Sequence, residues 1–323
     1  MIERELGLGL QTDKNPGEYR ALARAAEESG FAVVTTFNDL WFQPALPALL
    51  EIAAATQRVR IGPSCLNPFT LHPVEIAGQI AMLDAVSGGR AFLGLAHGAW
   101  LGSLGIDQSA PATAIREAWE VIRRLLSGDA SGFEGRRFTL PEGERLRYAL
   151  PERPIPLLIG TWAPGLAAFA GEAAAELKVG GSANPAIVPV MRERIGNPAV
   201  RIVLGAVTVV DEDGDRARRV ARSEVAMYLA VVGQLDPTFS PDPELVARVR
   251  ALVAADDADS AGALIPDEVL TRFAFAGNPD EVAGQAEAAF EAGAGRVDFG
   301  TPHGDPEHRG VELLCKQVLP RLA

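Results

Sequence analysis

Two stretches far apart in the chain share one pattern: NPGEYRALARAAEESGFAVVTT at residues 15–36 and NPDEVAGQAEAAFEAGAGRVDF at residues 278–299. In each, an asparagine can cap a helix, a proline suits the first helical position, and a glutamate at the third can bond back to the cap. Glycine then ends the helix, and a short apolar run typical of a buried parallel strand follows. Because the same unit recurs, the pattern favours a repeated β/α fold.

The same alternation of helix and strand continues through the rest of the chain, and it predicts eight strands and the helices between them. The strands are expected at residues 6–10, 31–36, 59–64, 91–96, 156–159, 176–179 and 202–209 and from residue 296. Further helices are expected at about 45–56, 73–86, 111–126, 164–171, 186–195, 215–232 and 306–319. The prediction is therefore an α/β fold, a (β/α)8 TIM barrel formed as one domain by residues 1–323; an open doubly wound sheet is the alternative.

Two segments interrupt this rhythm and are interpreted as insertions, at about residues 127–153 and 235–265. The second is too long for an ordinary β/α loop. It is expected on the barrel rim, as a lid, a subunit contact or simply a solvated helical hairpin.

Composition excludes several classes of partner. The net charge of −12 argues against nucleic acid and against an anionic membrane surface. No apolar run is long enough to span a bilayer, and the charged N-terminus has no signal-peptide pattern. Two cysteines make no disulfide framework, which predicts a cytoplasmic location.

The predicted fold also predicts where the site lies, because active sites of these barrels lie at the C-terminal ends of the strands. This rule selects Gln11, Asn38, Asp39, Ser64, Cys65, Ala96, His97, Gly98, Gly160, Thr161, Gly180, Gly181, Ser182 and His303. The turn at residues 180–182 offers consecutive N–H groups and a hydroxyl, which suit a phosphate; the alternative is an ordinary turn. Aromatic residues near the same ends are candidates for an apolar pocket wall or for rim packing: Trp41, Phe42, Trp100 and Trp162.

Motifs for other chemistries are missing from the sequence. It contains no P-loop, no GxGxxG after a strand, no GxSxG and no HExxH. Nucleotide hydrolysis, Rossmann-type binding, a hydrolase triad and a metal site are therefore not expected.

Residues 59–106 read VRIGPSCLNPFTLHPVEIAGQIAMLDAVSGGRAFLGLAHGAWLGSLGI, and this block resembles the bacterial luciferase-like family. It is most similar to the branch of deazaflavin-dependent oxidoreductases that includes methylenetetrahydromethanopterin reductases. Residues 273–282 (FAFAGNPDEV) and 301–304 (TPHG) are further matches. The resemblance implies a barrel that holds a flavin-like ring across its strand ends, with coenzyme F420 as the expected cofactor and FMN as the alternative. It also implies a small-molecule substrate and a possible homodimer.

The resemblance further implies roles for single residues. The family forms a non-prolyl cis peptide behind the cofactor ring, and the matching bond here is Ser64–Cys65. Asn38 and Asp39 match a polar pair near the ring, so Asp39 is a candidate acid or base, or else a helix-capping residue. Relatives carry an acid where this chain has Ala99, which cannot relay a proton. His97 is a candidate substitute; it could instead bind the cofactor's tail phosphate or hydrogen-bond a loop.

Three functions follow from these expectations. The first is a coenzyme F420-dependent oxidoreductase that transfers hydride between the deazaflavin and a small organic substrate. The second is an FMN-dependent monooxygenase of the same superfamily. The third is a cofactor-binding protein without turnover, which Ala99 makes plausible.

Overall fold

The structure is a computed structural model that describes residues 4–322, and it confirms the predicted (β/α)8 barrel. Within these residues the barrel strands pair in parallel in the order β3-β2-β1-β11-β9-β8-β7-β4. Isolated bridges from Ile61 to Ala91 and from Leu66 to Leu95 join β3 to β4 and close the circle. The strands are β1 Glu5–Leu10, β2 Val33–Thr36, β3 Arg60–Pro63, β4 Leu93–Leu95, β7 Leu157–Gly160, β8 Glu176–Gly180, β9 Arg201–Val210 and β11 Arg296–His303.

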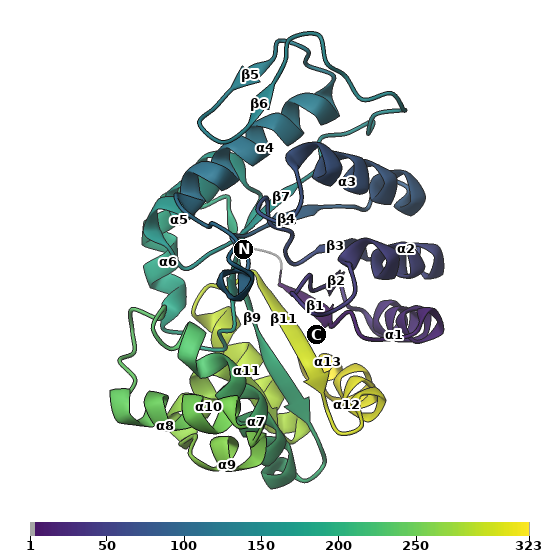
Figure 1. The fold of residues 1–323 in the computed structure, drawn as a ribbon. Helices are drawn as coiled ribbons and strands as arrows, with labels where there is room; N and C mark the ends of the chain where they lie inside the picture. The colour runs from purple at the N-terminus through teal and green to yellow at the C-terminus, as the bar shows by residue number, and fades with distance from the viewer. Residues whose placement is uncertain (1–3, 323) are drawn as a thin grey trace.

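Helices surround these strands, as Figure 1 shows. They are α1 Pro16–Ser29, α2 Ala45–Ala55, α3 Pro73–Ser87, α4 Pro111–Ser127, α5 Pro164–Ala173, α6 Ile187–Ile195, α7 Gly214–Val232, α11 Pro279–Glu291, α12 Glu307–Leu313 and α13 Leu319–Leu322. The capping pattern that decided the fold is present in both repeats: Asn15 and Asn278 each form a capping box with the glutamate three residues on. Gly30 ends α1 in the left-handed region with φ of 102°, which is why glycine suits this position.

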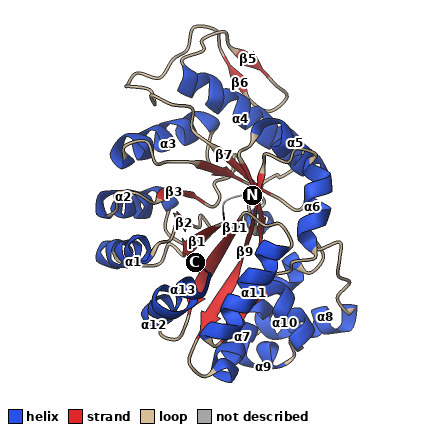
Figure 2. Cartoon of the chain, turned by 180° about the vertical axis from the view of Figure 1, so that it is seen from behind, coloured by secondary structure: helices blue, strands red, loops and turns tan. Residues whose placement is uncertain are grey.

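The two segments predicted as insertions lie on opposite sides of the molecule in both views (Figures 1 and 2). The first carries a small antiparallel hairpin, β5 Phe133–Glu134 with β6 Thr139–Leu140. The second carries α8 Pro243–Ala254 and α9 Ala258–Ala263, which pack against α7. Val246, Val249 and Ala261 are buried there in a second apolar cluster, which the segment shares with α7, with residues 269–276 and with Val209 of β9.

Three strands were not predicted from the sequence: β5 and β6 within the first insertion, and β10. β10, Ala274–Gly277, follows α10, Asp267–Phe273, directly and pairs with the outer half of β9, beyond the end of β8. It has four residues and no glycine or proline before it, so no local signal separates it from the preceding helix. It lies outside the barrel circle.

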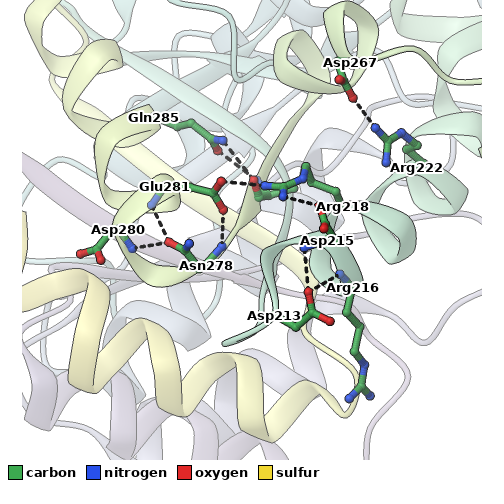
Figure 3. A network of polar contacts seen from close by, with 11 residues as sticks. Asp213, Asp215, Arg216, Arg218, Arg222, Asp267, Asn278, Asp280, Glu281 and Gln285 are labelled. Atoms are coloured by element: carbon green, nitrogen blue, oxygen red, sulfur yellow. Dashed lines mark hydrogen bonds and ion pairs between the residues drawn. The ribbon is translucent and has the colours of Figure 1, made fainter.

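Polar contacts fix the N-terminal half of α7 against the start of α11 (Figure 3). Arg218 donates to Glu281 at 2.8 Å and to Asp215 at 2.6 Å. Glu281 also accepts from the backbone N–H of Asn278 at 2.7 Å. These contacts join the first turns of the two helices.

Candidate active site

A cavity of about 730 Å³ opens at the C-terminal ends of the barrel strands. Its volume lies within the range of small-molecule and cofactor sites. Five glycines of the barrel strands line it: Gly9, Gly160, Gly180, Gly205 and Gly300. A β-carbon at Gly180 would meet no protein atom within 4 Å, whereas at Gly9, Gly160 and Gly205 it would meet the side chains of Phe37, Cys65 and Lys178. Gly180 therefore leaves ligand space, and the other three glycines make room for side chains that border the cavity.

Most of the predicted site residues line this cavity. They are Asn38, Asp39, Ser64, Cys65, Ala96, His97, Gly98, Gly160, Thr161, Gly180 and Gly181. The four predicted aromatic wall residues, Trp41, Phe42, Trp100 and Trp162, line it too, as does Ala99. Residues that were selected because they follow strands, although scattered along the chain, therefore form most of one continuous surface.

Cys65 forms part of the cavity floor. The Ser64–Cys65 peptide bond is cis. A β-carbon at Gly160 would lie 3.0 Å from the Cys65 Sγ atom, and one at Gly94 would lie 3.1 Å from it, so glycine on both neighbouring strands leaves room for the thiol. Burial raises the pKa of the Cys65 thiol to about 11. The thiol is therefore protonated and neutral near pH 7 and is a poor nucleophile.

Asp39 follows β2 and is held by a residue that follows β1. The Gln11 Nε2 atom donates to the Asp39 Oδ2 atom at 3.1 Å. Burial raises the pKa of Asp39 above its ordinary value of 3.8, and the hydrogen bond from Gln11 opposes this only in part. Gln11 does not itself line the cavity, so it acts on the site through Asp39. Asn38, which precedes Asp39, accepts a hydrogen bond from the Ala45 N–H at 3.1 Å, at the start of α2.

His97 lies at the exposed rim of the cavity, after β4. Partial burial lowers the pKa of its imidazole, which is therefore mainly neutral at pH 7. Its backbone carbonyl accepts from the Gln108 Nε2 atom at 2.6 Å.

Two expectations about strand ends are wrong. His303 does not point into the cavity: it is fully buried, with Nδ1 3.1 Å from a Glu307 carboxylate oxygen and Nε2 3.1 Å from the Phe299 carbonyl oxygen. Nor is the turn at residues 180–182 open to a phosphate. The N–H groups of Gly181 and Ser182 both donate to the Gly205 carbonyl, at 2.6 and 3.1 Å. Ser182 is fully buried and outside the cavity lining, and its hydroxyl accepts from the Asn184 N–H.

The structure adds residues that the sequence analysis did not select. Lys178 and Asp298 reach the cavity from inward positions of β8 and β11, and the Phe37 ring lies beside them. Lys178 and Asp298 could have been selected from the sequence, because a charged residue inside an otherwise apolar strand is unusual. Tyr228 comes from α7 and packs on Trp100 with ring centroids 5.8 Å apart. Nothing in the sequence near Tyr228 marks it, because only the tertiary structure brings α7 over the barrel mouth.

Two further features bear on what the site can hold. Among residues 4–322 no group of three or more histidine, cysteine or acidic side chains is placed to bind a metal ion. None of the helices in this part of the chain has the length and apolar character that crossing a membrane requires.

Comparisons with known proteins agree with this geometry. The family model described as luciferase-like monooxygenase matches residues 2–296. The 5,10-methylenetetrahydromethanopterin reductase of Methanopyrus kandleri is 28% identical over 346 aligned positions, covering 99% of this chain and 99% of that protein. The F420-dependent glucose-6-phosphate dehydrogenase of Kineococcus radiotolerans is 27% identical, covering 95% of this chain and 93% of that protein.

The fold comparison gives the same result. A solved structure of the coenzyme F420 dependent tetrahydromethanopterin reductase from Methanopyrus kandleri matches with a TM-score of 0.89 and 26% identity, covering 99% of this chain and 100% of that one. The resemblance read from residues 59–106 is therefore confirmed, because the match extends over nearly the whole barrel. This chain belongs to the luciferase-like monooxygenase family.

Proposed function

We propose that this protein is a coenzyme F420-dependent oxidoreductase that transfers a hydride between the deazaflavin and a small organic substrate. The observation that carries the proposal is the cavity of about 730 Å³ at the barrel mouth, whose lining brings Cys65, Gly160 and Gly180 together with Trp41, Trp100 and Tyr228. Two relatives that align along nearly the whole chain are named as a 5,10-methylenetetrahydromethanopterin reductase and as an F420-dependent dehydrogenase.

The residues present fit a flat, partly polar ring. The cavity lining is mainly apolar and aromatic, and it also includes the ion pair of Lys178 and Asp298. Ser64 lines the cavity as well, but its Oγ atom is buried from solvent. Ser64, Cys65, Ala96 and Gly160 would face the ring. When bound, the deazaflavin supplies a carbon that accepts or gives a hydride.

The chain's own residues would prepare this transfer. The neutral Cys65 thiol offers a compact apolar surface and no competing thiolate. Trp41, Trp100 and Tyr228 would exclude water from the cavity mouth, which protects a hydride from solvent. Asp39 would hold or release the proton that accompanies the hydride, because burial raises the pKa of its carboxyl from the ordinary value towards neutral pH. Ala99 has no proton to offer, so the proton would come from the β2 side of the site.

A binding titration tests the cofactor. Purified protein is titrated with coenzyme F420 and separately with FMN, and fluorescence quenching gives each Kd. We expect tighter binding of the deazaflavin. Tighter binding of FMN would favour the monooxygenase chemistry for which the family is named. Steady oxidation of the reduced deazaflavin by any carbonyl or imine acceptor would exclude a protein that only binds the cofactor.

Replacing Gly180 with valine is expected to weaken deazaflavin binding by about tenfold to hundredfold. Gly180 lines the cavity, and a β-carbon there meets no protein atom within 4 Å. The new side chain would therefore occupy ligand space without disturbing the fold. The measurement is the Kd from fluorescence quenching, together with the thermal unfolding midpoint. Gly17→Val is the matched control, since Gly17 in α1 also has open space around it but lies away from the cavity. Equal Kd values for the two variants would contradict the prediction.

A further inference from the structure

Lys178 is a buried cation at the floor of the cavity. It occupies an inward-facing position of β8, two residues before Gly180, and its side chain is only 7% exposed. Its Nζ atom donates to the Asp298 Oδ2 atom at 2.7 Å and lies 5.8 Å from the centroid of the Phe37 ring. All three side chains line the cavity. The ammonium therefore faces the space that a ligand would enter.

A chain of buried ion pairs holds this ammonium from behind. The Asp298 Oδ1 atom accepts from the Arg296 Nε atom at 2.8 Å, and Arg296 donates to Glu176 at 2.6 Å. The stem of Lys178 lies across Gly205, where a β-carbon would approach its Cε atom to 2.6 Å. Packing and charge together fix one position for the Nζ atom. These four side chains carry two positive and two negative charges. Glu176 also pairs with the less buried Arg60 and Arg201, which pair in turn with Glu5.

The ammonium has donors to spare. A lysine ammonium carries three N–H donors, and Asp298 is the hydrogen-bond acceptor that the described residues provide for it. Buried donors without acceptors cost free energy unless a ligand or water satisfies them. The Lys178 ammonium can therefore donate a hydrogen bond to an acceptor atom of a ligand bound in the cavity.

We propose that Lys178 binds an oxygen atom at one end of the deazaflavin ring system and is thereby a cofactor-binding residue; this step rests on the proposed function. The ring system carries carbonyl oxygens at its pyrimidine end and a phenol oxygen at the other. An ammonium beside the pyrimidine end favours the reduced ring, which carries more negative charge there. One beside the phenol favours its ionised form. In the first case the fixed charge changes the reduction potential of the bound cofactor, and in the second it changes the pKa of the phenol.

The test removes the ammonium without leaving a buried unpaired charge. In the double variant Lys178→Met/Asp298→Asn, Arg296 keeps Glu176 as its partner, so its charge is not left unpaired. The Kd for oxidised coenzyme F420, measured by fluorescence quenching, is expected to rise by about tenfold to hundredfold. Lys14→Met is the matched control. Its side chain is also 7% exposed and ion-paired, with Asp13 and Glu307, but it does not line the cavity. This control is expected to bind the cofactor as wild type does.

The outcomes separate this inference from the proposed function. A wild-type protein that does not bind the deazaflavin overturns both. A wild type that binds, with a double variant of equal Kd, overturns only the role of Lys178. If thermal unfolding shows that the double variant does not fold, Lys178→Gln replaces it under the same criterion.

Two further measurements on the bound cofactor distinguish the two ends of the ring. A phenol titration, followed by absorbance, that moves to higher pH in the variant assigns the phenol oxygen. A larger loss of affinity for reduced than for oxidised cofactor assigns the pyrimidine end.

Discussion

Arg296→Met is expected to lower the free energy of unfolding by about 3–5 kcal/mol, the usual cost of removing one partner from a buried ion pair. Arg296 is fully buried inside the barrel and donates to Glu176 and to Asp298. Without its guanidinium, Asp298 keeps Lys178 as its partner, while Glu176 keeps only the more exposed Arg60 and Arg201. The measurement is urea denaturation at neutral pH, followed by circular dichroism.

The pH dependence of this loss follows from Asp298. Burial by itself would raise the pKa of Asp298, but the positive charges of Arg296 and Lys178 hold it below its ordinary value. Its ionised form therefore contributes stability above its unfolded-state pKa, and this contribution is lost as the pH falls through the folded-state pKa. The difference between wild type and Arg296→Met should consequently shrink in acid.

The matched control for this prediction is Arg4→Met. Arg4 pairs with Glu287 at 2.8 Å, but both side chains are well exposed, and such surface pairs contribute little. A loss of stability in Arg296→Met as small as that in Arg4→Met would show that the buried network does not hold the barrel together.

Asp39→Asn is expected to reduce kcat by about a hundredfold to ten-thousandfold, the range of a lost general acid or base. The amide keeps the size of the side chain and a hydrogen bond with Gln11, so cofactor affinity should change little. The measurement is steady-state turnover of the deazaflavin with an acceptor that the wild type reduces. Asp13→Asn is the control, because Asp13 is half exposed and lies outside the cavity lining. Full turnover by Asp39→Asn would remove Asp39 from the proton step.

The same variant makes a prediction about stability. Since the folded protein raises the pKa of Asp39, the contribution of this carboxyl is complete below its unfolded-state pKa, near 3.8, and is lost as the pH rises through the folded-state value. Asparagine has no charge to bury at any pH. Asp39→Asn should therefore unfold at a higher temperature than wild type at neutral pH and at about the same temperature in acid.

Local chemistry explains why so much of the fold was predictable. A cap, a proline, an apolar helix face and a terminal glycine act within some twenty neighbouring residues, as in α1 and α11. Their repetition predicted the eight barrel strands. β10 escaped because its four residues gain their strand conformation by pairing with β9, a partner more than sixty positions away.

Site residues could be predicted only where their place at the end of a strand is enough to bring them to the cavity. Residues that end parallel strands meet at one face whatever their partners, so Asp39, Cys65 and Gly160 were found. Side-chain orientation and hydrogen bonding depend on groups that are distant in the sequence, so local patterns do not predict them. The Gly205 carbonyl takes the N–H groups of the turn at residues 180–182, and Glu307 holds His303 away from the cavity.

The sequence alone predicts alternating strands and helices, with a (β/α)8 barrel preferred to an open sheet, and it predicts the face that carries the site, because helix caps and strand ends are local features. Closure of the barrel and the further residues that join the site depend on contacts between distant elements. The tertiary structure places Tyr228 of α7 against Trp100, and it turns Lys178 toward the cavity with Asp298 and Arg296 behind it. The physical reason is that burial, ion pairing and the pKa of Asp39 depend on elements that are distant in sequence and meet only when the barrel closes.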